Sequence, residues 1–155
     1  MSELKRYFPD NRLAKALSAA RPRSVAQCLE AAEVNVASIA GPCRDQVIGA
    51  IAELEGLVRA WPAEPDERFL DSLYSAGLKI VGVATAGGLP LVDRAVASLL
   101  DVIDGQLTHG SAVKEPVEVH IATAKMLAQT GMGETQAQQL LAGLAKVRDK
   151  HRARH

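Results

Sequence analysis

Proline and glycine divide this chain into segments in which apolar residues recur at helical spacing, and this feature constrains the fold more than any other. Apolar residues follow one another at steps of three and four from Val25 to Gly41-Pro42, where proline removes a hydrogen bond and should kink or split a helix. The spacing resumes at Val47 and stops at Trp61-Pro62. We therefore expect one long kinked helical segment over residues 24–60.

The same punctuation predicts the remaining helices. Asp10 and Ser24 are residue types that cap helix starts, and each precedes such a segment. The pair Gly87-Gly88 should end one helix, and Pro90 suits the first turn of the next. Besides the long segment, the expected helices lie at about 10–20, 65–85, 90–104, 116–130 and 134–152, with a connector at 105–115. Short connections favour antiparallel neighbours.

Composition favours an all-α fold in a single domain. The chain has 155 residues, of which 48% are hydrophobic, and this length suits one domain with its own core. Only five residues are aromatic, whereas alanine and leucine are abundant. Small and aliphatic side chains of this kind pack well between helices. We therefore expect one domain over residues 1–155.

The lack of a long apolar segment favours a cytoplasmic location, and the two cysteines indicate no site. No apolar stretch reaches the roughly 18 to 20 residues that a membrane helix needs, so we expect no membrane insertion. Cys28 and Cys43 are too far apart for a C-x-x-C redox or zinc pair, and two such thiols are more often small buried hydrophobic residues. The sequence indicates no metal and no cofactor.

The net charge of zero conceals an uneven distribution along the chain. Residues 1–24 hold six basic and two acidic side chains, and residues 143–155 hold five and one. The intervening residues 25–142 therefore carry 7 basic and 15 acidic side chains. The negative net charge of these residues would repel phosphates, which argues against nucleic acid as a partner. The basic residues at 143–155 could contact an acidic partner, but basic residues of this kind more commonly belong to a solvated helix end.

Residues 82–89, GVATAGGL, have the glycine spacing of a phosphate-binding loop. Such a loop needs a lysine for the phosphates and a hydroxyl side chain for magnesium, but Gly88 and Leu89 stand at those positions. The surrounding chain also supplies no partner strands for the strand that would precede the loop. A helical interpretation of this region is therefore favoured.

As a helix, residues 73–87 carry two apolar stripes. The first stripe repeats at steps of four and three and predicts a seam that packs against other helices. The seam consists of Leu73, Gly77, Ile80, Ala84 and Gly87. The second stripe consists of Tyr74, Leu78, Val81 and Thr85. A helix this apolar is either buried on two sides or offers one side to a partner.

The order of residues over 73–92 is similar to that of a known family. Leu73-Tyr74 is followed by Gly77 and Gly82, and then by the run GLPLV at 88–92. This order resembles the active-site helix of histidine-phosphotransfer (HPt) domains, in particular the HPt-like proteins of alphaproteobacterial chemotaxis clusters, the CheE type. Residues 97–104 and 117–127 also resemble the next two helices of that family.

The resemblance implies an antiparallel four-helix bundle of the HPt type over residues 24–130. One additional helix would precede the bundle and one would follow it. Residues 1–23 and 131–155 would then be basic helical extensions.

The departures from the family's pattern shape the function that the resemblance implies. Leu78 stands where the family has its phosphorylated histidine, and Val81 stands where it has a lysine. Phosphoryl relay needs an imidazole nucleophile and a nearby cation, and neither side chain supplies one. The implied protein is a non-catalytic pseudo-phosphotransfer adaptor that binds a response-regulator receiver domain or a histidine kinase. Its partner-binding residues would be Tyr74, Leu78, Lys79, Val81, Gly82 and Thr85.

His120 is a candidate for a replacement phosphorylation site. A helical histidine among apolar neighbours is more often a structural hydrogen-bonding group, and no lysine stands at residues 121–123. His109 lies in the predicted connector and is expected to be solvated. His151 and His155 are four residues apart, but two ligands on a terminal turn make a poor metal site.

The sequence identifies no catalytic centre. No serine or cysteine can be assigned a base and an orienting group, and the carboxylates at 64, 66, 67 and 71 are typical of a helix start. We therefore expect no enzyme, although catalytic groups that assemble in space escape a sequence pattern. Two alternatives to the adaptor stay open: a structural scaffold that forms homo-oligomers such as a homodimer, and an active phosphotransfer protein that uses His120.

Overall fold

The structure is a computed structural model that describes residues 24–129 and 132–153. Regular secondary structure in this part of the chain is entirely helical, without a strand. The all-α prediction is therefore confirmed for these residues, and the strand that a phosphate-binding loop would require does not occur among them. The predicted helix at 10–20 lies outside the described residues.

The chain divides into two units, residues 1–35 and 36–155, and the boundary falls inside helix α2, Val25–Arg59. The structure describes residues 24–35 of the first unit. Ser24 caps α2 as predicted: its Oγ accepts a hydrogen bond from the Gln27 N–H at 3.2 Å, and Gln27 Oε1 accepts one from the Ser24 N–H at 3.0 Å. This reciprocal pair satisfies two backbone donors at the helix start.

Pro42 does not split α2, so the single helical segment predicted over residues 24–60 is confirmed and the alternative of a split at the proline is wrong. Gly41 and Pro42 are both exposed, so the proline ring does not have to be accommodated in the core. Packing stabilises the helix beyond the proline, because its later turns are buried in the second unit. The buried residues of α2 are Val47, Ala50, Ile51, Leu54 and Val58.

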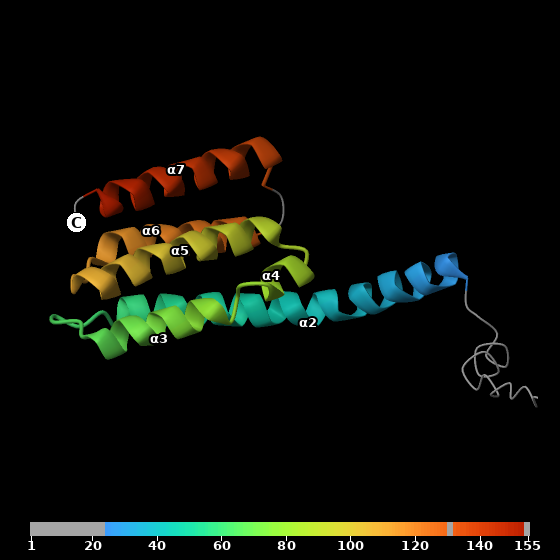
Figure 1. Ribbon diagram of the computed structural model, residues 1–155, viewed down its shortest axis with the longest axis horizontal. Coiled ribbons are helices and arrows are strands. Elements are labelled where there is room, and N and C mark those ends of the chain that lie inside the picture. Colours follow the sequence, from blue (N-terminus) through green and yellow to red (C-terminus); the bar gives the residue numbers. More distant parts are fainter. Residues whose placement is uncertain (1–23, 130–131, 154–155) are drawn as a thin grey trace, which may run out of the picture. The chain divides into compact units, whose positions relative to one another are not determined.

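The second unit is organised around α5, Pro90–His109. This helix packs against α3 (Glu67–Leu78), α4 (Val83–Ala86), α6 (Lys114–Ala128) and α7 (Glu134–Arg152), as Figure 1 shows. Helices α6 and α7 also pack against each other. Because α5 has neighbours on several sides, it buries eight side chains: Val92, Ala95, Val96, Leu99, Leu100, Val102, Ile103 and Gln106.

The helix boundaries after residue 104 differ from the prediction. Helix α5 continues through Gly105, because Gln106 is fully buried and Leu107 packs against the core, and this burial outweighs the low helix propensity of one glycine. Helix α6 begins at Lys114, which places Pro116 in its first turn, where proline is tolerated. The connector is therefore four residues long, 110–113. Helix α7 has the predicted bounds.

The single helix predicted at 65–85 is two helices. Helix α3 follows the N-cap residue Asp66, whose carboxylate accepts a hydrogen bond from the Phe69 N–H at 2.9 Å, and it ends at Leu78. Residues 79–82 form a turn, and α4 follows. Gly82 sets the break, because its φ of 81° lies in the left-handed region, which glycine adopts at little cost.

The predicted packing seam persists across this break. Leu73, Ile80 and Ala84 have no exposed surface. Gly77 and Gly87 are also buried. A Cβ atom at Gly87 would lie 3.0 Å from the backbone nitrogen of Arg44, so the end of α4 approaches the backbone of α2 closely because this residue is glycine.

Candidate functional site

The residues predicted to bind a partner surround the turn between α3 and α4. We name this set the α3–α4 corner: Tyr74, Leu78, Lys79, Val81, Gly82 and Thr85. Leu78 is 51% exposed and Val81 is 39% exposed, whereas Tyr74 is half-buried against the core. The sequence left the exposure of Leu78 open, and the structure places this side chain in solvent. The second stripe is not one continuous helical face, because Val81 lies in the turn.

Asp93, in the first turn of α5, holds the α3–α4 corner in shape. Its Oδ1 accepts a hydrogen bond from the Gly82 N–H at 2.9 Å, and its Oδ2 accepts one from the Thr85 hydroxyl at 2.6 Å. One carboxylate thus satisfies a backbone donor at the start of α4 and ties that helix to α5. Sequence reasoning missed Asp93; the available signal was an acid just after Pro90, where the helix dipole favours one.

Lys79 forms the charged rim of the corner. Its Nζ lies 2.8 Å from both carboxylate oxygens of Glu53 on α2. Both side chains are about half exposed, and such surface ion pairs contribute about 0–1 kcal/mol to stability. The pair therefore does little for the fold and leaves a cation and a carboxylate beside the exposed leucine.

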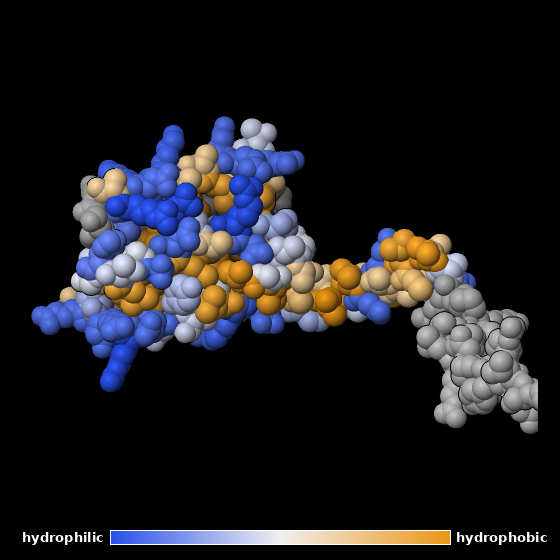
Figure 2. Space-filling model, viewed as in Figure 1, coloured by the Kyte–Doolittle hydropathy of each residue, from blue (hydrophilic) through white to orange (hydrophobic). Residues whose placement is uncertain are grey.

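The chemistry of the corner suits docking better than group transfer. Leu78 offers no nucleophilic atom, Val81 offers no charge, and the Thr85 hydroxyl is engaged by Asp93. Apolar side chains that stay in solvent are available for burial against another surface. Figure 2 shows hydrophobic surface on the visible face in the region of α3, α4 and α5, and mostly hydrophilic side chains over α7.

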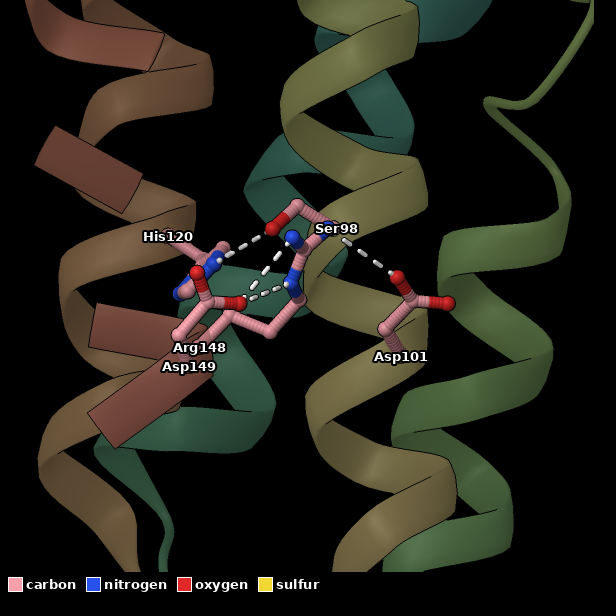
Figure 3. Close-up of polar contacts among 5 residues, drawn as sticks. All are labelled: Ser98, Asp101, His120, Arg148 and Asp149. Carbon is pink, nitrogen blue, oxygen red and sulfur yellow. Dashed lines mark hydrogen bonds and ion pairs between the residues drawn. The ribbon is translucent and has the colours of Figure 1, made fainter. Parts of the chain in front are cut away.

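His120 lies elsewhere, fully buried on α6. Its Nδ1 is 2.7 Å from the Pro116 carbonyl oxygen, and its Nε2 is 3.1 Å from the Ser98 Oγ of α5 (Figure 3). A carbonyl oxygen can only accept a hydrogen bond, so we assign the ring proton to Nδ1. In the neutral ring, Nε2 then accepts the hydroxyl hydrogen of Ser98.

The surroundings of His120 favour the neutral imidazole. Burial lowers the pKa of His120 below its ordinary value of 6.5. The hydrogen bond to Pro116 raises this pKa, the Arg148 guanidinium lowers it, and the Asp101 carboxylate raises it, in decreasing order of effect. With both ring nitrogens engaged and no exposed surface, His120 is placed as a structural histidine and not as a nucleophile for a phosphodonor.

Arg148 of α7 completes this polar group. Its Nη1 lies 3.4 Å from Asp101 Oδ2 on α5, and its Nη2 lies 3.1 Å from Asp149 Oδ1 (Figure 3). The guanidinium therefore links α7 to α5. Ser98 and Arg148 were both missed from the sequence, because they come from helices whose neighbours only the tertiary structure reveals.

The remaining histidines and cysteines form no recognisable site. His109 is exposed at the end of α5, His151 is buried on α7, and His155 lies outside the described residues. Over residues 24–129 and 132–153, no group of three or more histidine, cysteine, aspartate or glutamate side chains could hold a metal ion. None of the described helices is long and apolar enough to cross a membrane.

Comparisons with protein-family models, with curated proteins and with solved structures find no match for this chain.

Proposed function

We propose that this protein is an adaptor of two-component or chemotaxis signalling, non-catalytic in phosphoryl transfer, that binds a response-regulator receiver domain through the α3–α4 corner. The observation that carries the proposal is the exposure of Leu78 and Val81, at 51% and 39%, where the HPt-like pattern has its phosphorylated histidine and lysine. In this proposal α2, α3, α5 and α6 form an HPt-type four-helix bundle, and α7 is an additional helix. The protein would act in the cytoplasm, where such partners are found.

The charge of the chain determines how a receiver would dock. Residues 25–142 carry eight more acidic than basic side chains, so contact with an acidic phosphorylation pocket is unfavourable. Docking should depend instead on apolar surface around that pocket. Complete burial of a leucine or valine side chain contributes about 1.5–3 kcal/mol before the costs of association. Leu78 and Val81 are already partly buried, so their combined contribution is smaller but sufficient to dominate a weak interface.

A binding titration with matched variants tests the proposal. The purified protein is titrated with each receiver domain encoded beside it, phosphorylated and unphosphorylated. Leu78→Glu should weaken binding at least about tenfold, because a carboxylate would have to be desolvated at the apolar contact. The control is Val119→Glu, since Val119 is 43% exposed but lies on α6. Both variants should keep the helical circular dichroism spectrum.

Two outcomes would overturn the adaptor. Unchanged binding of Leu78→Glu would remove the corner from the interface. Equal losses in Leu78→Glu and Val119→Glu would show that any new surface charge disturbs binding, so the corner would have no special role.

A homo-oligomeric scaffold is the second candidate. It is favoured by large apolar side chains that are about half exposed elsewhere in the second unit: Val36, Ile39, Ile48 and Met126. Light scattering over a range of protein concentrations tests it, and a monomer throughout would remove it. The relay through His120 has no such support, because that imidazole is buried, and an assay for acid-labile phosphate tests it directly.

A further inference from the structure

Ser98 opens onto a groove between α5 and α7 that the adaptor function does not use. The groove has a volume of about 290 Å³. Its charged and polar lining includes Arg94, Ser98, Asp101 and Arg148, and its apolar lining includes Leu141 and Leu144. Ser98 is partly exposed there, whereas His120 behind it is fully buried. A small molecule in the groove would therefore meet the hydroxyl before the imidazole.

Ser98, His120 and the Pro116 carbonyl are arranged as nucleophile, base and orienting group. The Ser98 Oγ lies 3.1 Å from His120 Nε2, and the opposite ring nitrogen is held 2.7 Å from the Pro116 carbonyl oxygen. The carbonyl fixes the tautomer that leaves Nε2 free to accept a proton from Ser98. This is the geometry by which a histidine activates a hydroxyl. The burial that lowers the pKa of His120 also keeps the ring in the accepting form near neutral pH.

We propose that Ser98 is a nucleophile, assisted by His120, that reacts with small activated acyl esters in the α5–α7 groove. Ser98 lies inside α5, where the helix itself uses the backbone N–H groups, so side chains must stabilise the developing oxyanion. Arg94, one helical turn earlier, supplies a cation that lines the same groove, whereas Arg148, on the facing helix, is paired with Asp101 and Asp149. Leu141 and Leu144 supply an apolar wall for a short acyl or aryl group.

The first step transfers the acyl group to Ser98. The hydroxyl proton moves to His120 Nε2 while a bond forms between Ser98 Oγ and the carbonyl carbon. The bond from that carbon to the leaving aryl oxygen breaks, and the aryl oxide takes the proton from the imidazolium. Water then attacks the acyl-serine by the reverse proton path and releases the carboxylic acid. Asp101, which faces this polar group from α5, partly offsets the charge of the transient imidazolium.

This activity does not depend on the α3–α4 corner. Helix α7 packs against α5 and α6, whereas the corner belongs to α3 and α4. Loss of partner binding in Leu78→Glu should therefore leave the reaction of Ser98 unchanged, and failure of either proposal leaves the other standing.

The test uses p-nitrophenyl acetate and the full-length protein. Mass spectrometry of proteolytic peptides should locate an acetyl group on Ser98, with acetylated surface lysines as the internal reference for non-specific reaction. Ser98→Ala should lose that adduct and the associated release of p-nitrophenolate. His120→Gln should slow acetylation of Ser98 by roughly 100-fold, the order expected for loss of a general base. The matched control is Ser75→Ala, because Ser75 is an exposed serine on α3.

Equal release of p-nitrophenolate by wild type and Ser98→Ala, together with no acetyl adduct on Ser98 in the wild type, overturns the proposal. Circular dichroism establishes that each variant is folded. If His120→Gln does not fold, the comparison of Ser98→Ala with Ser75→Ala still decides the result.

Discussion

The α3–α4 corner and the Ser98–His120 group are opposites in composition and burial. The corner exposes Leu78 and Val81 to water, whereas the polar group places a histidine with no exposed surface beneath α7. The corner comes from one short stretch of chain, and the polar group is assembled from α5, α6 and α7. Burial, and not residue type alone, therefore separates a surface that is available to a partner from a histidine that contacts only its neighbours in the chain.

The two regions also contribute differently to stability. An apolar side chain in solvent contributes little to the free energy of unfolding, so the residues of the corner can serve binding without a loss of stability. A buried imidazole is tolerated only when its nitrogens are hydrogen-bonded, so His120 must be satisfied before the fold is stable. Substitutions should consequently affect binding in the first region and the free energy of unfolding in the second.

The largest expected contrast lies within α3 itself. Leu73→Ala should lower the free energy of unfolding by about 2–5 kcal/mol, because Leu73 has no exposed surface and its loss leaves a cavity. Leu78→Ala, at a position that is 51% exposed, should change it by no more than about 0.5 kcal/mol. Urea denaturation measures both. Similar losses in the two variants would mean that Leu78 belongs to the core and not to a surface.

The pH dependence of stability should isolate the buried polar group. The pKa of His120 is lowered in the folded protein, so the unfolded chain binds more protons as the pH falls below about 6.5. The free energy of unfolding should therefore decrease below that pH, by up to about 1.4 kcal/mol per pH unit for one proton. The decrease should stop below the folded pKa.

Denaturation of the wild type and of His120→Gln at several pH values between about 7.5 and 5 measures this effect. The variant should be less stable at neutral pH, because it loses the hydrogen bonds to Ser98 and Pro116. It should also lack the decrease in the free energy of unfolding with falling pH that His120 causes. Identical slopes would show that His120 is readily protonated in the folded state and that it is not buried as described.

A further expected effect concerns the backbone of the corner. Gly82→Ala should cost about 1–2 kcal/mol, because a residue with a Cβ atom is strained at a φ of 81°. Gly56→Ala is the matched control, since Gly56 is exposed in α2 and has open space around it; it should gain about 0.5–1 kcal/mol. Thermal denaturation should give shifts of opposite sign. A stabilising Gly82→Ala would mean that α3 and α4 join into one helix.

The sequence predicted the helices well where the signal is local. The apolar spacing gave the all-α class, the seam that includes Leu73 and Ile80, and the bounds of α7. Ser24 was predicted as a cap, and its bond to Gln27 confirms this. These features depend on residues within one or two helical turns, so a linear pattern contains the necessary information.

The sequence failed where a distant residue decides the geometry. The break before α4 depends on Gly82 and on Asp93, which is eleven residues further along the chain. Ser98 and His120 are 22 residues apart, and their contact follows only from the packing of α5 against α6.

Hydrogen exchange tests the docking role of the corner most directly. The protein is measured alone and saturated with the receiver domain that binds it in the titration. We predict slower exchange over residues 74–89, which contain the turn and α4, and unchanged exchange in α7. Slower exchange confined to α6 or α7, with residues 74–89 unaffected, would contradict the assignment of the α3–α4 corner as the binding surface.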